Sequence, residues 1–233
     1  MRRSKLYKAQ IATIEPQKRY EFDEAIAKLK EMSHVKFDET VELALKLGVD
    51  TRTSDQTVRG AVALPGGTGK QVRVAVVADG PAADEAKAAG ADFVGYTDMV
   101  DKIKGGWVDF DILIATPEAM KLVRPLGRQL GPKGLMPNPK TGTVTEQTGP
   151  AVAEAKAGRA EFRADRGACV HVPIGKLSFE ASALKANFAA VADALLKAKP
   201  ASTKGNYFLS CTISTTMSPG IKINLKELSG GKE

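Results

Sequence analysis

The hydrophobic pattern of this chain changes twice along its length, and these changes constrain the fold most strongly. In the middle, residues 72–78, 91–95 and 110–116 are short apolar segments typical of buried strands. Helical stretches are expected between them at residues 82–89 and 97–104, and a further helix is expected to open at Pro117-Glu118, where proline suits the first turn. Short apolar strands that alternate with helices predict a parallel α/β unit.

The outer parts of the chain show a two-residue alternation instead. In residues 37–47 the odd positions Val41, Leu43, Leu45 and Leu47 are apolar. In residues 207–217 the even positions include a row of four hydroxyls. This alternation predicts an antiparallel sheet with one apolar and one polar face, and the amphipathic segments 22–32 and 184–197 are expected to cover the apolar face as helices.

The two patterns together predict an α+β domain that is interrupted by an inserted α/β domain. The split domain is expected to comprise residues 1–67 and 160–233, and the inserted domain residues 68–159. The outer parts hold 22 basic and 16 acidic residues, whereas the middle holds 12 and 11, so the positive charge lies mainly on the split domain. The two adjacent crossings form a natural hinge, for which we expect the glycines Gly66, Gly67, Gly69 and Gly158.

Composition gives little support to an enzyme. The two cysteines, Cys169 and Cys211, and the two histidines, His34 and His171, show no spacing typical of a metal site or a catalytic triad. Residues 66–70 (GGTGK) resemble a phosphate loop, but Leu64 and Gln71 stand where that motif needs glycine and Ser or Thr. We therefore expect no catalytic residue, metal, cofactor or small-molecule substrate. The start of the chain has no apolar stretch, which favours a soluble cytoplasmic protein without a membrane partner.

Residues 126–144 have the composition of a working loop, with three prolines and several glycines. Between Ala119 and Lys140 there is no acid. The five basic residues of this segment are Lys121, Arg124, Arg128, Lys133 and Lys140. A cationic loop with few bulky side chains suits contact with a polyanion, although composition alone fits a solvated surface loop equally well.

The predicted polar sheet face also suits nucleic acid. It gathers Lys36, Thr40, Glu42, Lys46, Arg163, Asp165 and the hydroxyl row that ends at Thr216. Lysine and arginine neutralise phosphates, hydroxyls bond to ribose and phosphate oxygens, and a carboxylate accepts from guanine amino groups or a 2′-OH. A solvated sheet face is the alternative. Phe37 and Met217 lie on the apolar register, so core packing is expected for each unless the sheet edge lets it touch a ribose.

Several motifs, in order, give the chain a close resemblance to the bacterial large-subunit ribosomal protein L-one family, the protein of the mobile rRNA stalk. The motifs are residues 36–42 (KFDETVE), 54–60 (SDQTVRG), 106–111 (GWVDFD), 126–140 (LGRQLGPKGLMPNPK), 175–179 (GKLSF) and 214–219 (STTMSP). The resemblance runs from about residue 7 to residue 224. It implies a split first domain that binds a folded region of large-subunit rRNA and an inserted Rossmann-like second domain.

The resemblance also implies site residues and partners. Carried over residue by residue, the rRNA contacts are expected at Lys36, Phe37, Thr40, Glu42, Lys46, Arg163, Asp165, Arg166, His171, Ser210, Thr216, Met217 and Ser218. Family members usually have glycine at position 218, so Ser218 puts the local geometry in question, and Gly66 stands where members often carry histidine. The implied partners are exit-site tRNA, through the basic loop, and the messenger of the protein's own operon, whose translation many members repress.

Off the ribosome the protein is expected to be a monomer. Two other functional classes remain open at this stage. One is an α/β enzyme or nucleotide-binding module that uses the inserted domain, and the other is a dedicated messenger-binding repressor without a ribosomal role.

Overall fold

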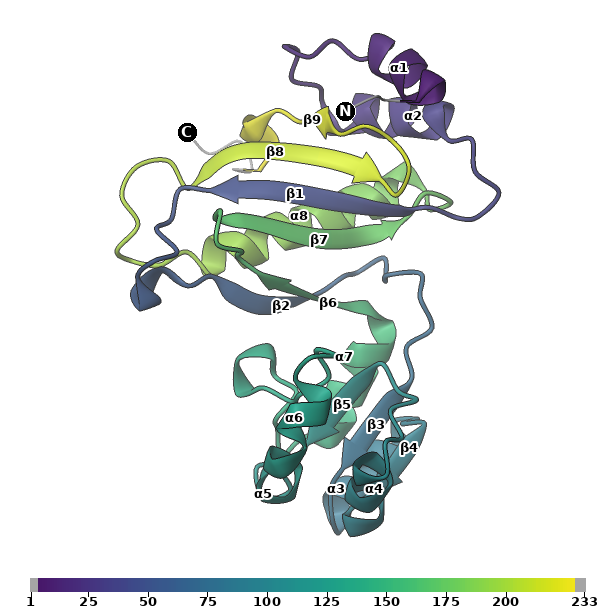
Figure 1. Ribbon diagram of the computed structural model, residues 1–233, viewed down its shortest axis with the longest axis vertical. Coiled ribbons are helices and arrows are strands. Elements are labelled where there is room, and N and C mark those ends of the chain that lie inside the picture. The colour runs from purple at the N-terminus through teal and green to yellow at the C-terminus, as the bar shows by residue number, and fades with distance from the viewer. Residues whose placement is uncertain (1–3, 229–233) are drawn as a thin grey trace. The chain divides into compact units, whose positions relative to one another are not determined.

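The structure is a computed structural model that describes residues 4–228, without the side chains of Ser54 and Lys140 (Figure 1). The chain forms two compact units. Unit 1 comprises Met1–Gly69 and Ala160–Glu233, and unit 2 comprises Lys70–Arg159. No helix among the described residues is both long enough and apolar enough to cross a bilayer.

Unit 1 is built on a four-stranded antiparallel sheet in the order β7-β1-β8-β9. The strands are β1 (Thr40–Leu47), β7 (Cys169–Lys176), β8 (Phe208–Thr215) and β9 (Ile221–Lys222). A second sheet pairs β2 (Arg59–Ala63) with β6 (Arg159–Arg163). The helices are α1 (Lys5–Ala12), α2 (Phe22–Met32) and α8 (Ala181–Lys197), with short 3-10 turns η1 (Ser54–Gln56) and η4 (Leu225–Glu227).

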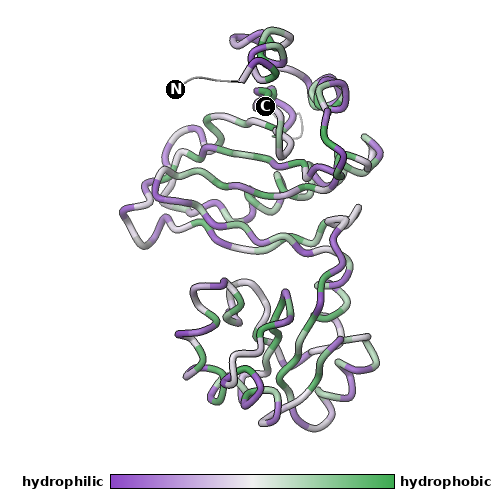
Figure 2. Tube along the Cα trace, turned by 45° about the vertical axis from the view of Figure 1, so that its right-hand side comes forward, coloured by the Kyte–Doolittle hydropathy of each residue, from purple (hydrophilic) through white to green (hydrophobic). Residues whose placement is uncertain are grey.

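The core of unit 1 lies between one face of the main sheet and the helices α2 and α8. The apolar positions predicted along β1, Val41, Leu43, Leu45 and Leu47, are all buried, which confirms the alternation read from the sequence. Leu29 of α2 and Val191 of α8 belong to the same core, and the rings of Phe22 and Phe188 join the two helices with centroids 4.7 Å apart. The antiparallel sheet with two covering helices is therefore present, and its alternating hydropathy can be followed in Figure 2.

Both ends of the predicted alternation differ from the structure. Strand β1 begins only at Thr40 and β8 ends at Thr215, so Phe37 and Met217 lie beyond the sheet. They are 54% and 52% exposed, and the expectation of core packing for them is wrong. Leu209 is exposed too, because the register shifts from Lys46↔Ser210 to Leu47↔Phe208 and leaves it without a partner across the ladder.

Unit 2 contains three parallel strands in the order β4-β3-β5. They are β3 (Val74–Val77), β4 (Phe93–Gly95) and β5 (Ile112–Ala115). The helices are α3 (Pro81–Ala88), α4 (Thr97–Lys104), α5 (Met120–Val123), α6 (Gly127–Leu130) and α7 (Thr148–Gly158), with η2 (Arg124–Leu126) and η3 (Pro139–Thr141). Side chains from α4 to α6 pack with one set of strand residues, and those of α3 and α7 pack with the other set, so the sheet is buried on both faces.

Two expectations for unit 2 need correction, and one helix was not expected. A helix does not open at Pro117, because residues 117–119 form a turn and α5 begins at Met120. The helix α7 was not predicted. The segment after Leu126 is not wholly a loop, because Leu126 and Leu130 are buried in helical turns and Val144 bridges to Ala115 of β5. The segment is therefore anchored in unit 2 by leucines spaced four residues apart.

Candidate nucleic-acid interface

The strand register of unit 1 gathers five of the predicted rRNA contacts, Thr40, Glu42, Lys46, His171 and Ser210, on one surface. Side chains alternate along a strand, and residues that pair across strands share a face. Opposite the buried positions of β1 lies a surface that we call the polar face. It consists of Thr40, Glu42, Ala44 and Lys46 of β1, His171 of β7, and Ser210, Thr212 and Ser214 of β8.

Within the polar face, the strand pairing determines which groups are neighbours. Glu42 pairs with Ser214, and Lys46 pairs with Ser210. Ala44 pairs with His171 on one side and Thr212 on the other. Glu42, Lys46, His171 and Ser210 are exposed. Acid, base, imidazole and hydroxyl groups are thus held by three paired strands, at a spacing set by the ladder.

At the Thr40 end of β1, two segments far apart in sequence meet. The backbone N–H of Thr40 donates a hydrogen bond to the Thr216 hydroxyl at 3.2 Å. Exposed Met217 follows in the same turn, and exposed Lys36 and Phe37 precede β1. We call Phe37, Thr216 and Met217 the tip. Lys176 also lies here, and its ammonium group donates to the Thr40 hydroxyl at 2.9 Å.

Ser218 closes the turn that carries Thr216 and Met217. Its hydroxyl accepts a hydrogen bond from the Thr215 N–H at 2.9 Å, and its own N–H donates to the Thr215 carbonyl at 3.3 Å. Among the described non-glycine residues only Ala168 has a positive φ, so Ser218 does not occupy the left-handed region. The backbone here does not require glycine.

At the Lys46 end, Arg163 ends β6 and the connection from β6 to β7 carries Asp165 and Arg166, and all three residues are exposed. A carboxylate oxygen of Asp165 accepts from the N–H groups of Gly167 and Cys169, at 2.8 and 2.7 Å, so this side chain organises the turn itself. Because Lys46 pairs with Cys169, the turn lies beside the Lys46 end of the polar face. The predicted site residues therefore form two clusters at opposite ends of the strands.

Three residues at this surface were missed by the sequence analysis. Glu39 is buried beneath the turn of residues 215–218, Lys176 bonds Thr40, and Lys222 pairs with Thr212 and so extends the polar face onto β9. Glu39 lies inside the motif of residues 36–42, but its turn partners are more than 170 positions away along the chain. The strand β9 has only two residues, which is too short for an alternation to be recognised.

The predicted hinge glycines do not all have equal freedom. The N–H of Gly66 donates to the side-chain oxygen of Asn187 at 2.8 Å, and the Asn187 amide donates to the carbonyls of Gly67 and Ile174 at 3.0 and 2.7 Å. Asn187 is fully buried on α8. Residues 66–67 are therefore fastened to unit 1. Gly67, Gly69 and Gly158 have positive φ angles of 72°, 70° and 113°, which favour glycine at these positions.

In unit 2, we call residues 119–140 the basic segment. Lys121, Arg124, Arg128 and Lys133 are exposed there, and none of them forms an ion pair with a described residue. The side chain of Lys140 lies outside the described part of the chain. The basic segment thus presents four solvated cations on helical turns and a glycine–proline loop.

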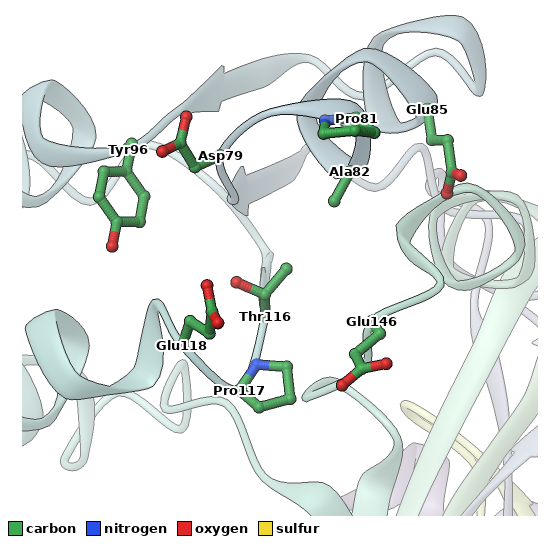
Figure 3. Close-up of a pocket in the computed structure, with 9 residues that line it drawn as sticks. All are labelled: Asp79, Pro81, Ala82, Glu85, Tyr96, Thr116, Pro117, Glu118 and Glu146. Carbon is green, nitrogen blue, oxygen red and sulfur yellow. The ribbon is translucent and has the colours of Figure 1, made fainter.

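A pocket of about 340 Å³ lies in unit 2 where the chain leaves β3 and β5 (Figure 3). This edge of a parallel sheet is where α/β proteins commonly bind nucleotides. Four carboxylates, from Asp79, Glu85, Glu118 and Glu146, line the pocket, and its lining contains no cation. That charge opposes the binding of phosphates, which disfavours a nucleotide module. Among the described residues no three His, Cys, Asp or Glu side chains are placed to hold a metal ion.

The polar face and its two clusters place acidic, basic and hydroxyl groups together on unit 1, and comparison with known proteins gives the family. The model of the ribosomal protein L1p/L10e family matches residues 29–219. The chain is 58% identical over 211 residues to the large ribosomal subunit protein uL1 of Teredinibacter turnerae, covering 91% of both chains. It is 53% identical over 226 residues to the same protein of Methylobacillus flagellatus, covering 97% of this chain and 98% of the relative.

The chain therefore belongs to the ribosomal protein L1p/L10e family, a family of structural ribosomal proteins and not of enzymes. The resemblance read from the sequence motifs is confirmed.

Proposed function

We propose that this protein is a structural component of the large ribosomal subunit, located with the ribosome in the cytoplasm, and that unit 1 anchors it to the stalk region of large-subunit rRNA. The observation that carries this proposal is the polar face, where paired strands hold an acid, a base and hydroxyls opposite the buried apolar positions of β1. A surface that carries acids as well as bases suits recognition of a folded RNA better than attraction to any polyanion.

Each part of the surface has a distinct chemical task in this proposal. Lys46 and Arg166 neutralise phosphates at one end, and Lys36 and Lys176 do so at the other. Glu42 accepts from a 2′-OH or a guanine amino group, and hydroxyls along β8 bond to ribose and phosphate oxygens. At the tip, the exposed Phe37 and Met217 lie against sugars or unstacked bases, which explains large apolar side chains outside the core.

Unit 2 has a separate role in the proposal. Its basic segment faces exit-site tRNA or neighbouring rRNA, and the two chain crossings let unit 2 move while unit 1 stays bound. Because Asn187 fastens residues 66–67 to unit 1, we place the pivot at Gly69 and Gly158 and not at Gly66. Repression of the protein's own operon follows in this scheme if the messenger offers unit 1 a similar RNA structure.

The test is the affinity of the full-length protein for a stalk rRNA fragment and for a scrambled hairpin of equal length, measured across a salt series. The proposal expects strong preference for the stalk fragment and only partial loss of binding with salt. Weak and equal binding to both RNAs with a steep salt dependence would show that basic charge alone is acting. That result would move the functional site to unit 2.

Two measurements separate the competing classes. Co-sedimentation with large subunits is expected for a ribosomal component and not for a dedicated messenger-binding repressor. A thermal shift with nucleotides tests the nucleotide-module class, since a ligand at 100 times its dissociation constant stabilises by about 2.7 kcal/mol. The acidic lining of the pocket in unit 2 leads us to expect no shift.

A further inference from the structure

Glu39 is the only charged side chain among the described residues that is buried, with 1% of its surface exposed. One of its carboxylate oxygens accepts a hydrogen bond from the Ser33 hydroxyl at 2.9 Å. The other accepts two, from the Thr215 hydroxyl at 2.7 Å and from the backbone N–H of Met217 at 2.9 Å. Both of the latter donors belong to the turn of the tip.

The carboxylate is held by hydrogen bonds alone, because no lysine or arginine among the described residues forms an ion pair with it. Burial raises the pKa of the Glu39 carboxyl, and the hydrogen bonds from Thr215, Met217 and Ser33 outweigh that effect, so its pKa lies below the usual range. Burying a charge is costly unless it is well bonded, and here two of the three bonds come from the turn of residues 215–218.

Glu39 directly precedes β1, and this position explains why its hydrogen bonds matter for the tip. The ladder between β1 and β8 ends at the pair Val41↔Thr215, so the tip lies beyond it. Past that pair, two links join the segments: the Thr40–Thr216 hydrogen bond and the Glu39 carboxylate. The carbonyl of Glu39 also accepts from the N–H of Leu177 at 2.9 Å, which ties the residue to the β7 side.

We propose that Glu39 is a positioning residue that holds the two halves of the tip, Phe37 on one segment and Thr216–Met217 on the other, in the arrangement that RNA contacts. This inference rests on the proposed rRNA binding by unit 1. Glu39 itself is buried and does not touch RNA. Its effect passes through the turn, which without the carboxylate would keep only its Thr40 and Ser218 bonds.

The plain alternative is that Glu39 merely stabilises unit 1. The two roles differ in what a second substitution does. If Glu39 acts through the tip, substituting Glu39 should no longer change RNA affinity once the tip side chains have been removed. If Glu39 acts through global stability, its effect persists whether or not the tip is present.

The experiment is a double-mutant cycle in the full-length protein, with affinity for the stalk rRNA fragment as the readout. Glu39→Ala is expected to weaken binding about tenfold or more, because a doubly used acceptor is lost. The same substitution in a Thr216→Val/Met217→Ala background is expected to change affinity by less than about threefold. Glu39→Gln keeps a carbonyl oxygen for Thr215 and Met217 and is expected to restore most of the binding.

Val191→Ala is the matched control, because it removes buried volume from the α8 side of the same core. Its stability loss is compared with that of Glu39→Ala, and it should leave affinity unchanged. If Glu39→Ala does not fold, Glu39→Asp replaces it, since the shorter side chain withdraws the oxygens and keeps the charge. Amide hydrogen exchange adds a readout without RNA: exchange at Met217 should speed up in the variant, while exchange at Ile213, within the ladder, should not.

Equal effects of Glu39→Ala with and without the tip would overturn the proposal, as would an unchanged Met217 exchange rate. Failure of the underlying function looks different. In that case the wild-type protein shows no preference for the stalk fragment, while the Met217 exchange result still stands.

Discussion

The polar face of unit 1 and the basic segment of unit 2 both offer groups that suit RNA, but they are built differently. The polar face stands on three paired strands, and a buried carboxylate fastens the turn at one end of it. The basic segment presents four exposed cations and no acid, on short helical turns and a glycine–proline loop. One surface mixes charges at fixed spacing, whereas the other offers a single sign of charge on long flexible side chains.

This difference suits the polar face to selective RNA binding and the basic segment to general attraction of phosphates. Groups whose positions are fixed by a ladder can be matched to one RNA shape, and a misplaced partner leaves an acid or a hydroxyl unpaired. Solvated lysines and arginines contribute a salt-dependent term that is nearly the same for any phosphate chain. Selective anchoring therefore belongs to unit 1 in the proposed function, and transient contact belongs to unit 2.

The largest expected effect comes from Thr216→Val at the tip of unit 1. The substitution removes a hydroxyl proposed to bond RNA and also the acceptor for the Thr40 N–H, so affinity for the stalk fragment should fall by about 1–3 kcal/mol. Binding is measured by filter or calorimetric titration, with circular dichroism to check the fold. Thr97→Val, which removes an exposed hydroxyl from α4 in unit 2, serves as the control. Unchanged affinity in Thr216→Val would count against the site.

The sequence predicted the parts of unit 1 that depend on regular alternation. Val41, Leu43, Leu45 and Leu47 are buried as expected, because a half-buried strand repeats every two residues. Phe37 and Met217 were placed wrongly, since alternation carries no signal for where a strand ends. The exposure of Leu209 could not be predicted from alternation, because a register shift depends on the neighbouring strand.

The residues of the candidate site could be predicted less completely than the fold. In the sequence, nothing distinguishes Glu39 from the other polar residues of its motif. Its proposed role depends on Thr215 and Met217, which come near it only after folding. In unit 2, Leu126 and Leu130 are spaced for a helix face, but the surrounding glycines and prolines concealed that signal. Contacts between distant segments are the part that a single sequence does not contain.

Lowering the pH should weaken the structure at the Glu39 end of the polar face and should have no such effect on the basic segment. The pKa of Glu39 is lowered in the folded state, so its stabilising effect is complete above its unfolded pKa of about 4.3 and is lost as pH falls through the folded value. The basic segment has no carboxyl group to titrate. Denaturant unfolding at pH 7, 5, 4 and 3 should show the wild-type protein losing more stability on acidification than Glu39→Gln. Parallel losses in the two proteins would mean that Glu39 titrates with an ordinary pKa.

A smaller effect is expected at Lys222, which extends the polar face through its pairing with Thr212. If this lysine contacts a phosphate, Lys222→Ala should reduce the slope of log affinity against log salt by about 1 for the stalk fragment. The matched control is Lys197→Ala, which removes the same charge from an exposed position on α8. The same change of slope in both variants would assign the effect to net charge and not to the position of Lys222.

The smallest expected effect is the one that most directly tests the division between the two surfaces. Arg128→Ala/Lys133→Ala removes two exposed charges from the basic segment, and affinity for the stalk fragment should stay within about 0.5 kcal/mol of wild type. Affinity for tRNA, measured over the same salt series, should fall and lose about two units of salt slope. This double substitution leaves the buried Leu126 and Leu130 in place, so the fold of unit 2 should be preserved. A large loss of stalk affinity with unchanged tRNA binding would reverse the roles of the units, because the selective contact would then depend on cations that no neighbouring strand holds in place.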